Sequence, residues 1–385
     1  MISVVSQPPW RHPRAAYLHI PFCAHHCGYC DFAVTAGQDH LVDLYLEALE
    51  MEIATLNAST PVNTIFLGGG TPTYLNPGQL QRLLRAINHW LPLQEERREF
   101  SIESTPDSVT EEKLALLVEH GVTRISIGVQ TFSGELLPKL DRIHGPEQIE
   151  AVLKMVRRFP LQVSLDLIFG IPTQSLEEWN ADLRRAVELG IDHLSTYGLT
   201  FEKGTPLWKQ QLRGEVQAVP EERELEMYLL AMDYLPSKGY EQYEISSFAP
   251  PEKRCRHNET YWANHAYFGF GVGAARYVQG KRELNTRNTQ DYIRRVLSGE
   301  SPTFQSEELV DEERATETVA VQLRRREGID RKSFQEQTSM NLDSLIGSRL
   351  TNLVEQGLVI DDGRSIYLSK SGKCVADGVI TELLK

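Results

Sequence analysis

Apolar and polar positions follow two periodicities along the first 200 residues, one typical of strands and one typical of helices. Short runs rich in β-branched and aromatic residues are separated by longer stretches with apolar residues at helical spacing, such as Leu41, Tyr45, Leu49 and Ile53. This order predicts a parallel sheet with right-handed crossovers, either doubly wound or curved into a barrel. The predicted strands are residues 15–20, 63–68, 99–104, 124–129, 162–170 and 193–200.

Apolar and polar residues also alternate within the predicted strands. The third strand places Phe100 and Ile102 on one face and Ser101 and Glu103 on the other, and the next two strands follow the same pattern. Parallel strands buried on both faces usually read as continuous apolar runs. The polar face therefore indicates a barrel-like cavity that holds a polar ligand. An antiparallel sheet with one solvated face is the alternative, and it fits the helical crossovers poorly.

Beyond residue 200 the pattern changes. A helix is expected over 220–237, and residues 240–278 are rich in aromatic residues and glycine. From about residue 305 the chain reads as helical and charged, ending in a helix over 341–356 and a hairpin that turns at Asp362 and Gly363. Helices followed by a small hairpin resemble a winged-helix unit. We expect three parts: a partial barrel (1–240), an aromatic and glycine-rich connecting segment (241–300) and a mostly helical, winged-helix-like C-terminal domain (301–385).

Composition and charge narrow the class of protein. The chain has 385 residues, of which 41% are hydrophobic and 24% charged, as in an ordinary globular protein of two or three domains. Its net charge of −13 argues against a protein that coats nucleic acid or anionic membranes, and a winged-helix regulator is disfavoured for the same reason. The chain has no run of 18 apolar residues, and residues 1–10 do not read as a secretory signal. We therefore expect a cytoplasmic protein.

Three of the five cysteines lie within eight residues. Cys23, Cys27 and Cys30 form a C-x3-C-x2-C spacing directly after the first predicted strand, whereas Cys255 and Cys374 are isolated. An odd number of cysteines with this clustering is a poor disulfide framework. Thiolates in a compact loop suit an iron–sulfur cluster. A structural zinc site with a nearby histidine as fourth ligand is the alternative. The candidate histidines are His19, His25 and His26.

The segment Tyr17-Leu-His-Ile-Pro-Phe-Cys23, together with this cysteine spacing, resembles the radical S-adenosylmethionine (SAM) superfamily. Within the superfamily it resembles the HemN/HemW branch, which contains oxygen-independent coproporphyrinogen III oxidases and haem chaperones. The resemblance implies a 4Fe-4S cluster held by Cys23, Cys27 and Cys30, with the fourth iron left for SAM. In this superfamily the reduced cluster breaks a C–S bond of SAM to form a radical. The implied fold is a partial (β/α)6 relative of the TIM barrel, followed by a HemN-type C-terminal domain.

Further motifs match this branch in order along the chain. Gly68-Gly69-Gly70-Thr71-Pro72 resembles the family's glycine-rich SAM motif, where glycine lets the backbone approach a ligand closely. Unpaired buried carboxylates are costly, and a cationic, hydroxylated ligand such as SAM would explain Glu103 and Asp166 on the polar strand face. Taken alone, Arg142 would read as a salt-bridge residue. The residues that the resemblance assigns to the SAM pocket are Tyr17, Tyr29, Gly69, Gly70, Thr71, Glu103, Gln130, Arg142 and Asp166.

Two departures separate the chain from the oxidases of this branch. The oxidases resemble C-x3-C-x2-C-x-C, whereas this chain has Phe32 at the position of the last cysteine. The Asp31-Phe32 pair is what HemW-like proteins carry. The oxidases also have an N-terminal extension that contributes to their active site, and only 22 residues precede Cys23 here. Both differences count against oxidation of coproporphyrinogen.

A third motif points to haem. Arg256-His257-Asn258-Glu259-Thr260-Tyr261-Trp262 resembles the H-N-x-x-Y-W segment of HemW-like proteins, whose histidine is implicated in haem binding. The resemblance implies that His257 contacts haem iron, that Tyr261 and Trp262 stack on the macrocycle and that Arg256 meets a propionate. The alternative is that His257 caps or packs the glycine-rich segment 267–275.

These features together predict a haem chaperone that carries a SAM-bound 4Fe-4S cluster and passes haem to an apo-haemoprotein acceptor. The acceptor could be membrane-associated, no nucleic-acid partner is expected, and the chain would act as a monomer or dimer. The alternative is an oxygen-independent coproporphyrinogen III oxidase, which would make the protein an oxidoreductase of porphyrin biosynthesis. Whether the chain catalyses a reaction is left open by the sequence.

Overall fold

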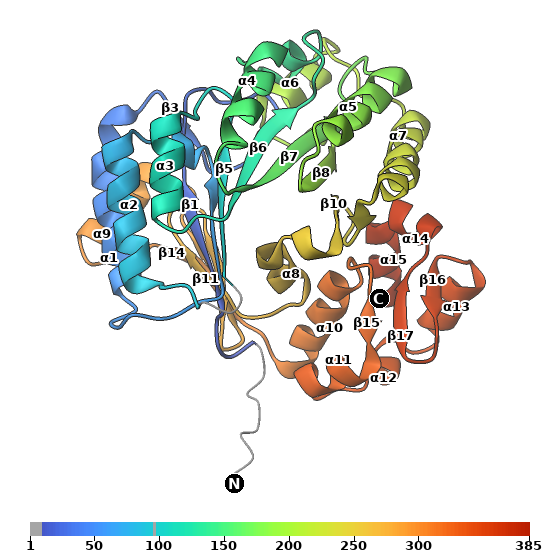
Figure 1. The fold of residues 1–385 in the computed structure, drawn as a ribbon. Coiled ribbons are helices and arrows are strands. Elements are labelled where there is room, and N and C mark those ends of the chain that lie inside the picture. The colour runs from blue at the N-terminus through green and yellow to red at the C-terminus, as the bar shows by residue number, and fades with distance from the viewer. Residues whose placement is uncertain (1–9, 95–97) are drawn as a thin grey trace.

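A computed structural model describes residues 10–94 and 98–385 (Figure 1). The larger part of the molecule is built on a curved nine-stranded sheet in the order β11-β1-β4-β5-β6-β7-β8-β10-β9. Its six central strands are parallel and follow chain order, which confirms the predicted partial (β/α)6 barrel. They are β1 (Ala15–Ile20), β4 (Thr64–Gly69), β5 (Glu99–Ser104), β6 (Arg124–Gln130), β7 (Gln162–Phe169) and β8 (His193–Gly198).

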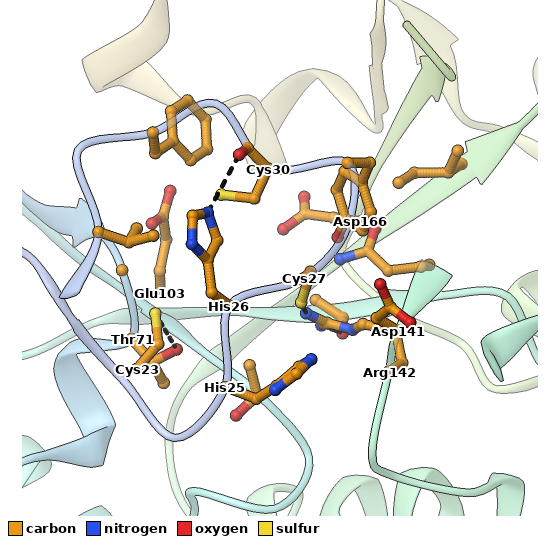
Figure 2. Close-up of a pocket in the computed structure, with 18 of the residues that line it drawn as sticks. Cys23, His25, His26, Cys27, Cys30, Thr71, Glu103, Asp141, Arg142 and Asp166 are labelled. Carbon is orange, nitrogen blue, oxygen red and sulfur yellow. Dashed lines mark hydrogen bonds between the residues drawn. The ribbon is translucent and has the colours of Figure 1, made fainter. Parts of the chain in front are cut away.

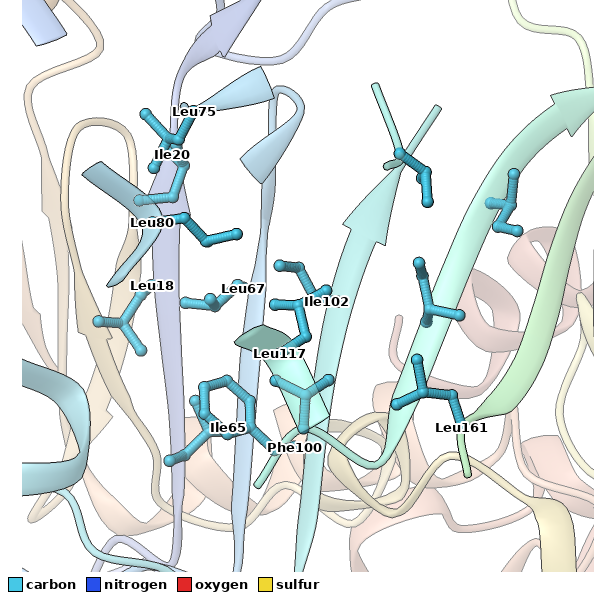
Figure 3. Close-up of a cluster of buried hydrophobic side chains, with 14 of the residues drawn as sticks. Leu18, Ile20, Ile65, Leu67, Leu75, Leu80, Phe100, Ile102, Leu117 and Leu161 are labelled. Atoms are coloured by element: carbon cyan, nitrogen blue, oxygen red, sulfur yellow. The ribbon is translucent and has the colours of Figure 1, made fainter. Parts of the chain in front are cut away.

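Helices cover the outer face of this sheet and bury its apolar residues (Figure 3). Ile65 and Leu67 of β4, Phe100 and Ile102 of β5 and Leu117 of α3 are fully buried in one hydrophobic cluster. Each such side chain contributes about 1.5–3 kcal/mol by leaving water. The predicted apolar strand face therefore lies against the helices, and the polar face points into the barrel. The covering helices are α1 (Val42–Ala54), α2 (Pro77–Trp90), α3 (Glu111–Glu119), α4 (Pro146–Val156), α5 (Leu176–Glu188) and α7 (Glu221–Tyr234). Helix α6 (Pro206–Leu212) instead packs in a separate small cluster and contacts the cysteine loop, where the N–H of Leu207 donates to the carbonyl of Gly28 at 2.9 Å.

Side-chain caps determine where several of these helices begin. The Asn76 side chain accepts the backbone N–H of Gln79 at 3.0 Å, and the Gln79 side chain accepts the N–H of Asn76 at 3.2 Å. Ser175 and Glu178 form the same reciprocal pair at the start of α5, at 3.1 and 2.8 Å. A cap of this kind stabilises a helix by about 1 kcal/mol and depends only on neighbouring residues. The sequence therefore defines these helix starts locally.

Residues after 240 complete both edges of the barrel sheet. On one edge, β10 (Ser247–Ala249) pairs antiparallel with β8, and β9 (Glu241–Gln242) pairs with β10. On the other edge, β11 (Phe268–Phe270) pairs parallel with β1. The segment 241–300 thus contributes strands to the barrel sheet. The division of the chain at residues 240 and 300 stays a prediction.

The amino-terminal end of the barrel is filled by α8 (Arg256–Trp262), which lies below the central strands in Figure 1. Glu99, the first residue of β5, is buried and accepts the backbone N–H groups of Arg256 and His257, both at 3.0 Å. Arg124, the first residue of β6, lies 3.9 Å from the Glu99 carboxylate. It also donates to two backbone carbonyls directly before the helix, at 2.6 and 3.1 Å. These contacts provide partners for charged groups whose burial would otherwise be costly.

A buried carboxylate joins α1 to α9 (Thr289–Leu297). Glu52 accepts hydrogen bonds from the backbone N–H of Gly271, the Asn285 amide and the Tyr292 hydroxyl, all at 2.7 Å. Burial raises the pKa of Glu52, and the three donors oppose this rise because they stabilise the charged form. Glu52 thereby attaches residues 271–292 to the first helix of the barrel.

A second, antiparallel sheet holds β12 (Ala275–Val278), β13 (Lys281–Asn285) and β14 (Thr303–Glu308). The prediction that the chain is helical from about residue 305 is wrong at this point, because β14 precedes the first C-terminal helix. No side chain of β14 is buried, so the strand carries no hydrophobic periodicity that could have identified it.

The C-terminal part has a hydrophobic cluster of its own, in which Ala315, Phe334 and Ile366 are fully buried. A helix, a short strand, further helices and a hairpin follow one another as in a winged helix, which agrees with the sequence-based prediction. The hairpin pairs antiparallel with the short strand, giving the order β15-β17-β16. The elements are α10 (Asp311–Gln322), β15 (Ile329–Asp330), α11 (Arg331–Thr338), α12 (Leu342–Ile346), α13 (Arg349–Glu355), β16 (Val359–Asp361), β17 (Ser365–Leu368), α14 (Lys370–Cys374) and α15 (Ala376–Leu383).

The single helix predicted over 341–356 is wrong. Helix α12 ends at Ile346 and α13 begins at Arg349, because Gly347 takes a positive φ of 56° that interrupts the helix. The two helices after the hairpin, α14 and α15, are also absent from the sequence-based prediction.

Among the helices of residues 10–94 and 98–385, none has the length and hydrophobicity needed to cross a bilayer. The prediction that residues 1–10 are not a secretory signal concerns nine residues that lie outside the described ranges.

The contacts of Glu99 predict that Glu99→Ala strongly destabilises the fold. The substitution would leave two buried N–H groups and the Arg124 guanidinium without their acceptor, and removing one partner of a buried ion pair typically costs about 3–5 kcal/mol. The free energy of unfolding in urea measures this cost. As a control, Glu111→Ala removes the exposed partner of Arg158 and should cost less than about 1 kcal/mol. Equal losses in the two variants would contradict the role of Glu99.

Candidate metal centre and cofactor pocket

A cavity of about 540 Å³ opens at the carboxyl-terminal ends of the parallel strands, under the loop that carries the three clustered cysteines (Figure 2). Polar residues at these strand ends face the same space, as the strand alternation predicted. The structure therefore brings most of the predicted site residues together. Those that line the cavity are Cys23, Cys27, Tyr29, Cys30, Gly69, Gly70, Thr71, Glu103, Gln130, Arg142 and Asp166.

The cysteine loop is closed by short-range hydrogen bonds. Strand β2 (Phe22–Cys23) enters the loop and pairs parallel with β3 (Thr35–Ala36), which leaves it. Inside, the N–H of Cys30 donates to the carbonyl of Cys27 at 3.1 Å, and Nε2 of His26 donates to the carbonyl of Cys30 at 3.2 Å. These bonds hold the three cysteines in one compact turn, which is the arrangement that cluster ligation requires.

All three cysteines of the loop are free thiols. Burial raises the pKa of Cys23 to about 12 and also raises the pKa of Cys30, so these two thiols are protonated near neutral pH. The Thr71 hydroxyl donates to Sγ of Cys23 at 3.6 Å. Across the described ranges, no three metal-binding side chains gather around one ion position. Each iron of a 4Fe-4S cluster takes one ligand from outside the cluster. Three cysteine thiolates would ligate three of the irons and leave the fourth for another ligand.

Arg142 supplies positive charge beside the cysteine loop. Its guanidinium donates to Sγ of Cys27 at 3.3 Å and to the carbonyl of Gly128. Its Nε is buried and has no hydrogen-bond partner among the described residues. A buried donor without a partner is costly, and it lies where an anionic cluster or the carboxylate of a ligand could accept it. The contacts of Arg142 are therefore to a cysteine sulfur and a backbone carbonyl, and not the salt bridge to a carboxylate that the residue taken alone would suggest.

The glycine motif allows the end of β4 to approach the end of β1 and the residue after it closely. Gly69 has a φ of +107°, and a Cβ at this position would lie 2.3 Å from the His19 ring. A Cβ on Gly70 would lie 2.7 Å from the carbonyl of Pro21. The N–H of Gly69 donates to the Glu103 carboxylate at 2.8 Å. Glycine is thus required here both for its backbone conformation and for space.

Two carboxylates lie at the base of the cavity. Burial, and then the charge of Asp166, raise the pKa of Glu103 to about 8, while the N–H of Gly69 opposes this rise. Burial also raises the pKa of Asp166, and the Ser126 hydroxyl donates to it at 3.1 Å. The positive charge of Arg142 opposes the rise in the pKa of Asp166 but does not cancel it. A cationic ligand would favour the ionised carboxylates, which is what SAM provides.

Tyr17 does not line the cavity but lies one layer deeper in the barrel. Its hydroxyl contacts Nδ1 of His19 at 3.0 Å, and its ring stacks on Phe66. The Nε2 atom of His19 in turn contacts the carbonyl of Ala33 at 2.9 Å. Burial lowers the pKa of His19 to about 4. His19, weighed above as a zinc ligand, instead joins the cysteine loop to the barrel interior.

Several lining residues were not singled out from the sequence. Tyr197 at the end of β8 and Ile143 both lie at the rim. Asp141 takes a positive φ of 53°, and a Cβ on Gly28 would lie 2.3 Å from its carboxylate, so these two loops pack tightly. The strand alternation could have identified Tyr197, because it shares the inward face with Ser195. Ile143 and Asp141 lie in a loop, where no alternation of apolar and polar residues indicates which side chains face the cavity.

The H-N-x-x-Y-W residues lie at the opposite end of the barrel. His257 is fully buried; its Nδ1 contacts the Thr64 hydroxyl at 3.0 Å and its Nε2 contacts the Tyr261 hydroxyl at 2.8 Å. Burial lowers the pKa of His257 to about 3. The ring also packs on Phe66, and Trp262 lies beneath the guanidinium of Arg324. Neither ring nitrogen of His257 is available to a haem iron in this conformation. The role of His257, Tyr261 and Trp262 in haem binding stays a prediction.

Family models match two parts of the chain: residues 17–186 match the radical SAM superfamily, and residues 309–375 match the HemN C-terminal domain. A protein of Bacillus subtilis named heme chaperone HemW is 38% identical over 96% of this chain and 99% of its own length. A protein of the same name from Lactococcus lactis is 33% identical over 97% of each chain.

Among solved structures, coproporphyrinogen III oxidase (HemN) from Escherichia coli superimposes with a TM-score of 0.85. The match covers 99% of this chain and 92% of the oxidase, at 24% sequence identity. At this identity the likeness shows a shared fold.

We predict that Cys23→Ala, Cys27→Ala and Cys30→Ala each lose the iron–sulfur absorbance after anaerobic reconstitution, because each removes a cluster ligand. Cys374→Ala is the matched control. Its sulfur contacts the carbonyl of Lys370 in α14, so the absorbance should persist. Stoichiometric zinc in place of iron and sulfide in the wild-type protein would contradict the cluster assignment.

Glu103 predicts how the stability of the cofactor-free protein depends on pH. Its pKa is about 8 in the folded state against an ordinary value of 4.5, so folding takes up a proton between these two values. Stability should therefore fall as pH rises through this window, by up to about 1.4 kcal/mol per pH unit. Asp166 contributes in the same direction, so Glu103→Gln should reduce the slope without abolishing it. Urea unfolding across this range measures the slope, with exposed Glu202→Gln as control. An unchanged slope in Glu103→Gln would contradict the assignment.

Proposed function

The chain belongs to the HemW family of radical SAM proteins, and we propose on this basis that it is a haem chaperone, which binds haem and transfers it to an acceptor haemoprotein. The observation that carries the proposal is the end-to-end similarity to proteins named heme chaperone HemW, at 38% identity over 96% of this chain. The likeness to the oxidase supports the shared fold, whereas Phe32 at the oxidase's cysteine position supports the chaperone.

In this proposal Cys23, Cys27 and Cys30 hold a 4Fe-4S cluster, and SAM occupies the cavity beside it. When bound, the reduced cluster supplies an electron for chemistry on SAM. Arg142 would neutralise charge at the cluster, because its guanidinium already contacts the Cys27 sulfur. Glu103 and Asp166 would face the cationic ligand, and Gly69 and Gly70 would let the backbone approach it. Thr71, Tyr29 and Gln130 line the same cavity.

Relatives named as heme chaperones imply by their name that haem is bound and handed on. A cytoplasmic location is our further expectation, because thiolates that must bind a cluster are kept reduced there. The acceptor itself, membrane-associated or not, would be identified by haem transfer rather than by the fold.

A single anaerobic preparation tests the chaperone against the oxidase. The protein with reconstituted cluster and added SAM should bind haemin in a saturable, stoichiometric manner, measured by absorbance titration. The same sample should not convert coproporphyrinogen III, measured by chromatography of the oxidised porphyrins and by release of carbon dioxide. Sustained conversion of coproporphyrinogen III would replace the chaperone with the oxidase. A sample that neither binds haemin nor turns over would reject both.

A further inference from the structure

We propose that Thr64 and Tyr261 prepare His257 to bind the iron of the cargo haem: Thr64 fixes the tautomer of the imidazole, and Tyr261 occupies the iron's position until haem displaces it. The inference rests on the proposed function and on the predicted haem contact of His257, and it specifies how that contact forms. Its basis is the environment of His257, a fully buried histidine with one hydroxyl group at each ring nitrogen.

The two hydroxyl groups decide which ring nitrogen of His257 carries the proton. Burial lowers the pKa of His257 to about 3, so the imidazole is neutral, with one N–H group and one lone pair. Its Nε2 lies 2.8 Å from the Tyr261 hydroxyl and its Nδ1 lies 3.0 Å from the Thr64 hydroxyl. A phenol is more acidic than an aliphatic alcohol and is therefore the better donor. Tyr261 thus donates to Nε2, and the N–H at Nδ1 donates to Thr64.

This tautomer is the one that iron requires at Nε2. A neutral imidazole binds a metal through its lone pair, while the other nitrogen donates its proton to an oxygen atom that orients the ring. Thr64, the first residue of β4, is buried, and Nδ1 of His257 is the one hydrogen-bond partner of its side chain among the described residues. Thr64 therefore supplies the orientation that a metal-bound imidazole needs before any metal is present.

Strand β4 also fixes the plane of the imidazole. Phe66 stands two residues after Thr64, on the same face of the strand. Its ring centre lies 5.2 Å from that of His257, with 32° between the two planes. Tyr17 on β1 stacks on Phe66 in turn, with 6.3 Å between the ring centres. Because one strand holds His257 both at Nδ1 and over the ring, Nε2 keeps its direction when its partner moves.

Tyr261 is the member of this group that can move. It lies four residues after His257, about one turn along α8, and its ring meets the imidazole edge-on with 4.8 Å between the centres. His257 is fully buried, whereas Tyr261 is half-buried and reaches accessible space. When haem binds, a coordination bond from Nε2 to iron would replace the hydrogen bond from Tyr261, and the exchangeable ligand of the haemin iron would leave. The Tyr261 hydroxyl keeps its proton, and no electron is transferred.

The first test titrates the full chain, with reconstituted cluster, with haemin and then reads the iron–histidine stretching mode of the dithionite-reduced haem by resonance Raman spectroscopy. Thr64→Val keeps the shape of the side chain and removes the acceptor. It should weaken haemin binding about tenfold, as loss of an outer-shell partner of a metal ligand does, and lower the stretching frequency. Thr64→Ser keeps the hydroxyl and should behave as wild type. Thr338→Val, which removes a buried hydroxyl bonded within α11, is the matched control and should leave both values unchanged.

Tyr261→Phe distinguishes this inference from a purely structural role of the hydroxyl. The variant keeps the ring and removes the group that competes with iron for Nε2. It should therefore tighten haemin binding about fivefold, the net value of one hydrogen bond. Tyr240→Phe is the matched control, because it removes a buried hydroxyl that donates to the carbonyl of Ile191 at 2.6 Å, and it should not change the affinity. Weaker or unchanged binding by Tyr261→Phe would overturn the role of Tyr261.

The outcomes separate this inference from the proposed function. If the wild-type protein binds haemin and the iron–histidine mode survives in His257→Gln, the inference is overturned and the chaperone stands. The same holds if Thr64→Val matches wild type in affinity and frequency. Absence of haemin binding by the wild-type protein would reject the proposed function and the inference with it. Cluster absorbance and urea unfolding check that each variant is folded; if Thr64→Val does not fold, the opposite sign expected for Tyr261→Phe decides.

Discussion

Every second residue of the barrel strands points inward, and most of these inward residues are polar, Phe66 being an exception. Carboxylates, a guanidinium, histidines and hydroxyls therefore share an interior that excludes most water, and each must find a partner there. This constraint governs the rest of the structure. The outer face of the same strands packs its apolar side chains under the helices. Many different combinations of apolar residues could fill that layer. The inner face is what makes this barrel specific.

The two ends of the barrel meet this constraint differently. At the amino-terminal end Glu99 accepts two backbone N–H groups of α8, and Nη2 of Arg124 donates to carbonyls before that helix. Unpartnered guanidinium nitrogens do not distinguish the two ends, because Nε and Nη1 of Arg124 and Nε of Arg142 all lack a hydrogen-bond partner among the described residues. The carboxylates do distinguish them. Glu99 lies 3.9 Å from Arg124, whereas burial and the charge of Asp166 raise the pKa of Glu103 to about 8. The carboxyl-terminal end is therefore the one where a cationic ligand would relieve an electrostatic cost.

The features that the sequence predicts well are those with local causes. Strand bounds, the polar strand face and the spacing of Cys23, Cys27 and Cys30 are all readable within a few residues. The features it misses depend on contacts between distant residues. His257 receives its environment from Glu99, 158 residues away, and from Thr64, so no local pattern distinguishes a packed histidine from a haem ligand. The break between α12 and α13 depends on Gly347 alone, and a single glycine within a helical pattern does not by itself predict that the helix ends. Strand β14 has no buried residue, so it shows no apolar face in the sequence.

Helix α8, described above as filling one end of the barrel, also restricts how a ligand reaches the other end. Glu103 and Asp166 line the cavity that lies under the cysteine loop. With α8 packed against the opposite end of the strands, a ligand of these carboxylates would pass beside that loop on entry and on release. Its exchange rate would therefore depend on whether bound metal holds the loop in place.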